Sequence, residues 1–236
     1  MTVVEKTDRR LSLSRWRLTA MIIVDLLMIL LEFLALRSCW EDSRTGMFYY
    51  YTQDSNLLAM LVCILSVVTA AVLMIRGGRT IPRWLALLRL TATGCVTLTL
   101  LIAAFVLVPL ESHGSLLLLR MEFVDFMLSG SMLYLHTVCP LLMIFSLLFL
   151  WGTSRLKLRH ALLAVIPTIL YGVILLRLNI TGRYAGPYPF LYVHRQPVFM
   201  TVIWCAAIVG GTFLIMQGLR LLSRFTAGRF WWQDKN

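Results

Sequence analysis

YYYTQDSNLLAMLVCILSVVTAAVLMIR, residues 49–76, decides the fold class of this chain. Three tyrosines precede five polar residues, Thr52 to Asn56, and a long apolar run continues from there to Ile75. A bilayer crossing by an α-helix needs about 20 predominantly apolar residues. The stretch therefore predicts a transmembrane helix over residues 55–75, with its polar start at the membrane surface.

The rest of the chain repeats this signal. Of its 236 residues 59% are hydrophobic and 14% are charged, which is too little charge to coat a soluble globule. We expect an all-α, polytopic membrane protein whose single domain, residues 1–236, is a six-helix bundle. The predicted helices span residues 16–36, 55–75, 84–109, 128–151, 161–180 and 198–222.

The net charge of +11 is distributed as a topology signal. Sixteen of the 22 Lys and Arg fall on alternate connections and at both termini, and six lie at or near the other side. The positive-inside rule therefore predicts that both termini are cytoplasmic. We expect contact with anionic membrane lipids and no nucleic-acid partner. The six outer cations are Arg37, Arg44, Arg120, Arg177, Arg183 and Arg195.

Metal and cofactor chemistry has little support in the pattern. No CxxC spacing occurs, and only one histidine, His136, lies inside an apolar segment. A haem-binding electron carrier would need a second histidine at membrane depth. We expect no cofactor and no metal.

Ionisable groups inside the membrane need a partner, a cavity or a task. Asp25 and Glu32 lie two helical turns apart on one face, and Arg89 or Arg177 is a candidate partner. His136 precedes Pro140 by four residues, and a helical proline crowds the carbonyl four residues back and bends the helix there. The imidazole either bonds to a neighbouring helix or lines a site.

The polar run at the start of the second helix also has two interpretations. Thr, Asp, Ser and Asn are preferred N-caps, so one of them can begin the helix. Five consecutive polar residues exceed that need, and the alternative is that they line a site. Counting back from the inner helix ends places Thr52 and His136 in the outer part of the bundle, separated by about 12 Å along the axis.

Three separated motifs resemble the androgen-induced membrane hydrolase family and its bacterial six-helix relatives. YYTQDSN, at 50–56, is similar to the bacterial aromatic-Thr-x-Gln-Ser-Asn pattern, although Gln53 and Asp54 depart from it. HTVCP, at 136–140, resembles the family's His-Thr-x-x-Pro segment. ITGRYAGPYPFL, at 180–191, resembles its Thr-Gly-x-aromatic-x-x-Tyr-Pro-Phe-Leu segment.

The resemblance covers about residues 15 to 225 and implies an enzyme that hydrolyses fatty acid esters of hydroxy fatty acids or related lipid esters. It implies a threonine nucleophile at Thr52 and a catalytic histidine at His136. The closest motif match is to bacterial members, so we expect an integral protein of a bacterial plasma membrane.

Thr52 and His136 suit this chemistry. A threonine hydroxyl is a poor nucleophile until a base removes its proton, and a histidine can be that base. The side chains expected to contact the substrate or cover the cleft are Tyr51, Asp54, Ser55, Asn56, Tyr184, Tyr188 and Phe190. No orienting carboxylate is assigned, and Ser55, Asn56 or backbone N–H groups are the candidates for oxyanion donors.

Two other classes of function remain open. A transporter of small molecules or ions would use Asp25, Glu32 and Arg177 along a path between broken helices. A catalytically silent lipid-binding protein would use Thr52 only as a helix cap. Contact between the Thr52 and His136 side chains inside a cavity favours the hydrolase, and their separation by packed helix contradicts it.

Overall fold

The computed structural model describes residues 13–78, 80–151 and 156–230, and every regular element in these ranges is helical. Six of its helices are long and apolar enough to cross a membrane. The predicted class, an all-helical membrane protein, is therefore confirmed for the described residues. The candidate spans are Arg15–Tyr49, Tyr51–Arg76, Arg83–Glu111, Gly130–Trp151, Leu158–Ile180 and Val198–Ala227.

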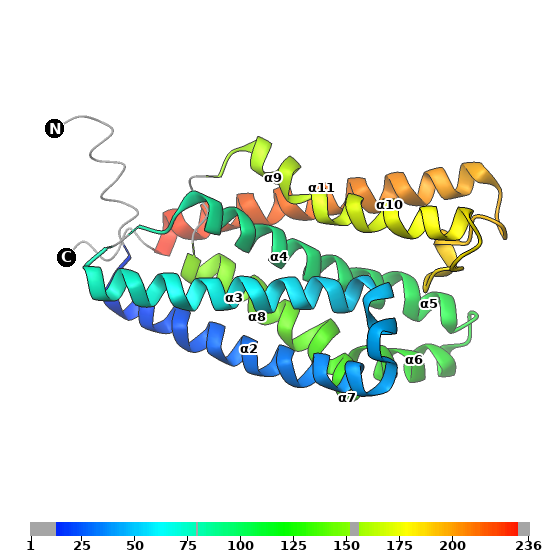
Figure 1. The fold of residues 1–236 in the computed structure, drawn as a ribbon, viewed down its shortest axis with the longest axis horizontal. Coiled ribbons are helices and arrows are strands. Elements are labelled where there is room, and N and C mark those ends of the chain that lie inside the picture. Colours follow the sequence, from blue (N-terminus) through cyan, green and yellow to red (C-terminus); the bar gives the residue numbers. More distant parts are fainter. Residues whose placement is uncertain (1–12, 79, 152–155, 231–236) are drawn as a thin grey trace.

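The first two spans form a pair that packs along its length (Figure 1). The first span is α2 (Arg15–Ser43), continued by the 3₁₀ helix η1 (Arg44–Tyr49). The second is α3 (Tyr51–Arg76), which ends where Gly77 adopts the left-handed conformation, φ 68°, that a glycine tolerates without strain. Tyr50, in extended conformation, is the only residue between η1 and α3.

The third and fourth spans each contain π-helical segments. The third consists of α4 (Arg83–Ile102), the π-helix η2 (Ala103–Leu107) and α5 (Val108–Glu111). A further helix, α6 (Leu116–Leu128), precedes the fourth span. That span consists of α7 (Gly130–Met132), the π-helix η3 (Leu133–Val138), α8 (Cys139–Ser146) and the π-helix η4 (Leu147–Trp151).

The last two spans complete the bundle. The fifth is divided at Val165 into α9 (Leu158–Ala164) and α10 (Ile166–Ile180), and the sixth is α11 (Val198–Phe230). The connection between them contains a short 3₁₀ turn, η5 (Pro189–Leu191).

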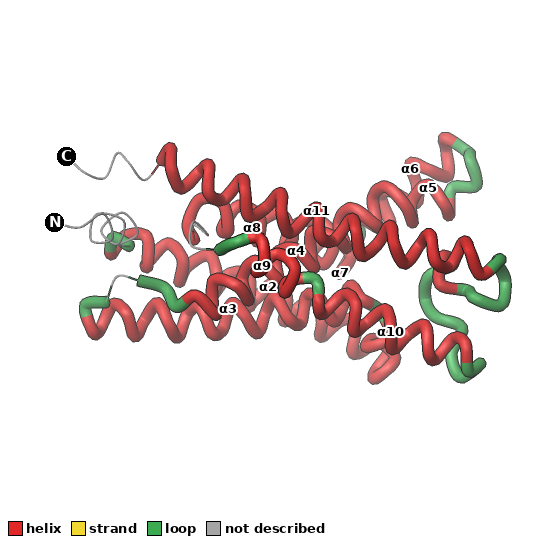
Figure 2. Tube along the Cα trace, turned by 90° about the horizontal axis from the view of Figure 1, so that it is seen from above, coloured by secondary structure: helices red, strands yellow, loops and turns green. Residues whose placement is uncertain are grey.

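The two ends of the bundle differ in what they carry. The start of α2 and the end of α11 lie at one end (Figure 1), and the α10–α11 and α5–α6 connections lie at the other (Figure 2). We call the latter the connection end. An even number of crossings accounts for this arrangement. Which end faces the cytoplasm stays a prediction from the charge pattern.

The polar run of the second span lies inside the helix, because α3 begins at Tyr51 rather than near residue 55. Its N-cap is Tyr50, which makes no side-chain capping bond. The capping interpretation of Thr52 to Asn56 is therefore wrong. Four of these five residues, Thr52, Gln53, Ser55 and Asn56, are buried against the rest of the bundle.

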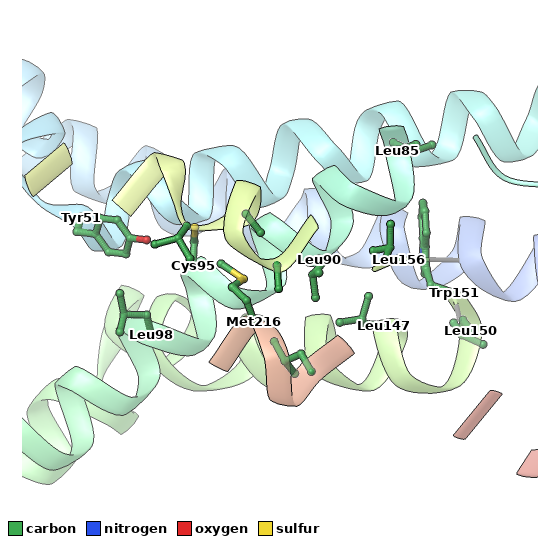
Figure 3. Close-up of a cluster of buried hydrophobic side chains, with 14 of the residues drawn as sticks. Tyr51, Leu85, Leu90, Cys95, Leu98, Leu147, Leu150, Trp151, Leu156 and Met216 are labelled. Atoms are coloured by element: carbon green, nitrogen blue, oxygen red, sulfur yellow. The ribbon is translucent and has the colours of Figure 1, made fainter. Parts of the chain in front are cut away.

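The interior combines an apolar core with a buried ion pair. Tyr51 and Cys95 lie toward one end of the core, and Leu85 and Trp151 lie toward the other (Figure 3). Arg89 and Asp25 form the ion pair at 2.7 Å, with both side chains fully buried. Of the two partners considered for the carboxylates of the first helix, Arg89 is therefore the one that Asp25 meets.

Candidate functional site

The structure brings the Thr52 and His136 side chains into hydrogen-bonding distance. The distance from Thr52 Oγ1 to His136 Nε2 is 3.1 Å, and the two residues are 84 positions apart in the chain. Both side chains are buried, with exposed fractions of 8% and 4%. The first residue lies in the first turn of α3 and the second in η3, so the contact joins the second and fourth spans.

A backbone carbonyl determines which nitrogen of His136 carries the proton. Nδ1 lies 2.7 Å from the carbonyl oxygen of Phe126. A carbonyl oxygen only accepts, so Nδ1 must donate, and the neutral ring then directs the lone pair of Nε2 at the Thr52 hydroxyl. Thr52 donates to Nε2 in this tautomer. This is the arrangement of a nucleophile, a base and an orienting group.

The carbonyl of Phe126 is available to His136 because it has no partner within its own helix. α6 ends at Leu128, and the last four carbonyls of an α-helix have no partner within the helix. The Thr137 hydroxyl donates to the carbonyl oxygen of Met127 at 2.7 Å, so two side chains of η3 satisfy consecutive carbonyls at the end of α6. The sequence predicted no membrane helix between residues 109 and 128, and the C-terminal end of α6 within this connection is what orients His136.

The proline after His136 acts on the local geometry of the helix. Pro140 lies in the first turn of α8 and has no N–H to donate to the carbonyl four residues back, that of His136. The chain adopts π-helical geometry over Leu133–Val138, immediately before it. The sequence predicted a bend at this turn, and what the structure has just before the proline is a π-helical segment, a feature that often occurs at functional sites.

Thr52 and His136 line a cavity of about 270 Å³. Its other walls come mainly from α4, η2, α10, α11 and the connection that contains η5, and most of the side chains are apolar. Ile169 and Val173 line the cavity and are also exposed on the surface of the bundle. The cavity is thus bordered by side chains that face the surroundings of α10, which in a membrane are lipid chains.

Asn56 and Ser55 are committed to the backbone of Thr52. The Asn56 amide nitrogen donates to the carbonyl oxygen of Thr52 at 2.7 Å and to that of Leu135 at 3.2 Å. The Ser55 hydroxyl donates to the same Thr52 oxygen at 2.9 Å. These bonds use the two side-chain donors that were considered for an oxyanion, so neither Ser55 nor Asn56 is free to supply one in this arrangement.

The aromatic residues of the α10–α11 connection divide into two groups. Tyr188 and Phe190 line the cavity and stack on each other, with ring centroids 5.2 Å apart. The Tyr188 hydroxyl oxygen accepts a hydrogen bond from the Tyr51 N–H at 3.2 Å. Tyr184 instead stacks on Tyr49 at 4.2 Å and does not line this cavity.

Asp54 and Ser55 line a second cavity of about 380 Å³, between α3 and α10. Tyr51 and Tyr171 line both cavities and form the wall between them. The Tyr51 hydroxyl is hydrogen-bonded to the Thr168 hydroxyl at 2.7 Å, which fixes its ring in that wall. Of the predicted substrate contacts, Tyr51, Tyr188 and Phe190 are therefore the ones that share a cavity with Thr52 and His136.

The ionisable residues expected for a transport path lie elsewhere. Asp25 is paired with Arg89, and Arg177 is exposed at the end of α10. Glu32 is fully buried, and within the described part of the chain neither of its carboxylate oxygens has a hydrogen-bond partner. None of these side chains lines the cavity that holds Thr52 and His136.

Sequence reasoning missed the orienting carbonyl of Phe126 and the bonds made by Asn56. A backbone acceptor has no signature in residue type, and only the end of a predicted helix before Ser129-Gly130 could have pointed to it. Over residues 13–78, 80–151 and 156–230, no cluster of His, Cys, Asp or Glu is placed to hold a metal ion. Comparison with known proteins finds no matching family model, curated protein or solved structure.

Proposed function

We propose that this protein is an intramembrane hydrolase of lipid esters, with Thr52 as the nucleophile and His136 as the general base. The observation that carries the proposal is the 3.1 Å contact between Thr52 Oγ1 and His136 Nε2 inside an apolar cavity. The 2.7 Å bond from Nδ1 to Phe126 supports it, because it leaves Nε2 able to accept the hydroxyl proton. The resemblance of three motifs to the androgen-induced membrane hydrolases points to the same two residues.

The first half of the reaction acylates the threonine. His136 Nε2 takes the proton of the Thr52 hydroxyl as Oγ1 attacks the ester carbonyl carbon. The tetrahedral intermediate collapses when the bond from that carbon to the alcohol oxygen breaks, and His136 returns the proton to the departing alcohol. An acyl-threonine and a free alcohol remain.

The second half regenerates the enzyme. A water molecule attacks the acyl carbon while His136 takes one of its protons. The bond to Oγ1 then breaks, and His136 protonates Thr52. The products are a fatty acid and the original hydroxyl group.

The cavity supports a lipid as the substrate. Its lining is mostly apolar, and it lies beside surface residues of α10, so an acyl chain can enter from the membrane between helices without crossing water. Fatty acid esters of hydroxy fatty acids and related acyl esters fit this chemistry. We place the protein in a bacterial plasma membrane with both termini in the cytoplasm, so that the substrate reaches the connection end from the outer leaflet.

The test is hydrolysis of a medium-chain 4-nitrophenyl ester by the full chain in detergent micelles. Loss of the nucleophile or of the base lowers kcat by about 10⁴-fold or more in enzymes of this type, so we expect Thr52→Ala and His136→Ala to show such a loss. Thr99→Ala is the matched control. Thr99 lines the same cavity, but its hydroxyl bonds only to the carbonyl of Val96 in its own helix.

We expect the Thr99→Ala variant to keep kcat within a few-fold of the wild type. Equal activity of Thr52→Ala and the wild type would reject this nucleophile.

A further inference from the structure

The hydroxyl of Tyr188 lies at the N-terminus of α3, beside the proposed nucleophile. Its oxygen accepts the Tyr51 N–H at 3.2 Å, and Thr52 is the next residue along α3. Tyr188 is 8% exposed and lines the same cavity as Thr52 and His136. A polar group of the α10–α11 connection thus reaches the place where the reaction would occur.

The connection holds this side chain rigidly. The Tyr188 ring stacks on Phe190 with an interplanar angle of 3°, and Tyr50 packs edge-on against it. The Asn179 side chain bonds to the carbonyl of Ala185 and to the N–H of Val193, which closes the connection on both sides of the tyrosine. The hydroxyl is therefore positioned before any substrate binds.

The hydrogen-bond pattern leaves the proton of Tyr188 available. Its oxygen receives the Tyr51 N–H, and a phenol that accepts a bond becomes a better donor through the other side of the same hydroxyl. Thr52 and Tyr171 line the same cavity as Tyr188, so a substrate carbonyl oxygen bound beside Thr52 can accept this proton.

The two side chains that were candidate donors are already engaged. The amide of Asn56 and the hydroxyl of Ser55 both donate to the backbone carbonyl of Thr52. The Thr52 hydroxyl itself must give its proton to His136 during attack.

We propose that Tyr188 is a further catalytic residue, whose hydroxyl donates a hydrogen bond to the ester carbonyl oxygen and stabilises the oxyanion that forms on it. The inference rests on the proposed hydrolase function. As Thr52 Oγ1 bonds to the carbonyl carbon, the electron pair of the C=O bond moves to the oxygen. Tyr188 keeps its proton and shares it with that oxygen, and the electron pair returns when the alcohol leaves.

The protonation of the phenol agrees with this role. Burial raises the pKa of Tyr188 to about 12, although the N–H and hydroxyl groups around it oppose the rise. The folded pKa lies above the ordinary value of about 10, so the protonated form is retained below pH 10 and is lost only as the pH rises through 12. Tyr188 is therefore a hydrogen-bond donor over the whole neutral range.

The test compares Tyr188→Phe, which removes one oxygen atom, with Tyr192→Phe. The control residue belongs to the same connection, has Arg195 over its ring at 5.2 Å and does not line the cavity. Loss of one oxyanion donor lowers kcat by about 10²- to 10³-fold, so we expect this loss for Tyr188→Phe with KM nearly unchanged, and wild-type kcat for Tyr192→Phe. A Tyr188→Phe enzyme with wild-type kcat would overturn the proposal.

A second substrate separates a catalytic role from a structural one. Sulfur accepts hydrogen bonds weakly, so a 4-nitrophenyl thionoester, in which C=S replaces C=O, gains little from an oxyanion donor. We expect the wild type to favour the ester over the thionoester and Tyr188→Phe to lose most of that preference. Equal losses on both substrates would show that Tyr188 only supports the fold, and would contradict the proposal.

The outcome is distinguishable from failure of the proposed function. If Tyr188 is not the donor but the hydrolase proposal is correct, Thr52→Ala remains inactive while Tyr188→Phe keeps its rate or its ester preference. If Tyr188→Phe does not fold, fluorotyrosine at position 188 keeps the hydroxyl and makes it a stronger donor. An unchanged ester-to-thionoester ratio in that protein would then overturn the inference.

Discussion

The amide of Asn56 connects the two segments that carry Thr52 and His136. One nitrogen donates to the carbonyl oxygen of Thr52 and to that of Leu135, the residue before the histidine. The side chain is fully buried, so no water competes for these bonds. Asn56 therefore sets the distance between α3 and η3 at the point where that distance matters for proton transfer.

Replacing Asn56 with Ala should lower both stability and rate. Two buried carbonyls each lose one hydrogen bond, and such a bond contributes about 0.5–1.5 kcal/mol, so we expect a loss of about 1–3 kcal/mol in the free energy of unfolding. We also expect a lower kcat on the 4-nitrophenyl ester, because the Thr52–His136 distance is no longer held. Unfolding in mixed detergent micelles and steady-state kinetics measure the two effects.

Ser66→Ala is the control for this change. Ser66 is buried in the same helix, but its hydroxyl bonds only to the carbonyl of Val62 one turn earlier. We expect wild-type kcat from it. If Asn56→Ala instead has the free energy of unfolding and the kcat of the wild type, its amide does not position Thr52 and His136.

At the scale of the elements, α4 and α11 approach closely where Gly94 faces Met216. A Cβ atom on Gly94 would lie 2.0 Å from the Sδ atom of Met216, whose side chain is fully buried. The same two helices contribute Leu98, Thr99, Cys205 and Ile208 to the walls of the cavity that holds Thr52 and His136. The glycine thus lets α11 sit at the distance from α4 that shapes the site.

Gly94→Ala should destabilise the bundle, because the Met216 side chain must move within a packed core. Overpacking of this kind costs about 1–3 kcal/mol. Gly218→Ala in α11 is the matched control, since its Cβ would meet nothing within 4 Å. We expect a lower unfolding temperature for Gly94→Ala alone, and equal temperatures for the two variants would contradict the close approach.

Much of this element structure was predictable from the sequence, and the reason is physical. Runs of about 20 apolar residues have few alternatives to a helix in lipid, where each backbone polar group must be satisfied within the protein. The residues at which the helices begin and end were less predictable. α3 begins at Tyr51, because Thr52, Ser55 and Asn56 bond within the bundle instead of facing water.

The site was predictable only in part. The Thr52 and His136 candidates came from motif resemblance, and their depth estimate left about 12 Å between them. The 3.1 Å contact depends on the extra helical residues before position 55 and on the π-helical geometry of η3, neither of which has a residue-type signature. The orienting carbonyl of Phe126 was out of reach for the same reason.

At the scale of the whole molecule, Arg89 connects several of the membrane spans. From α4 it pairs with Asp25 of α2 at 2.7 Å, contacts Cys63 of α3 at 3.3 Å and lies over the Trp151 ring of η4 at 5.1 Å. Four of the six spans therefore meet at one guanidinium. Such a buried pair is retained because loss of either partner leaves a charge without compensation.

Single and double substitutions of this pair should differ in a characteristic way. Removing one partner of a buried ion pair costs about 3–5 kcal/mol, so we expect Arg89→Gln or Asp25→Asn alone to destabilise strongly, and the double variant to be more stable than either. The free energies of unfolding of the wild type, the two single variants and the double variant, measured in detergent, give this double-mutant cycle. Glu41→Gln, which breaks the exposed Arg37–Glu41 pair, should have no measurable effect.

A double variant as unstable as the sum of the two single losses would contradict the pairing. In that case Arg89 would stabilise the bundle mainly through Cys63 and Trp151.

The central claim is that Thr52 becomes acylated through His136, and covalent trapping tests it most directly. A lipophilic fluorophosphonate should label the wild-type protein, and peptide mass spectrometry should place the adduct on Thr52. Thr52→Ala and His136→Ala should prevent labelling, while Thr99→Ala should leave it intact. An adduct on another residue, or labelling that persists without Thr52, would contradict the account.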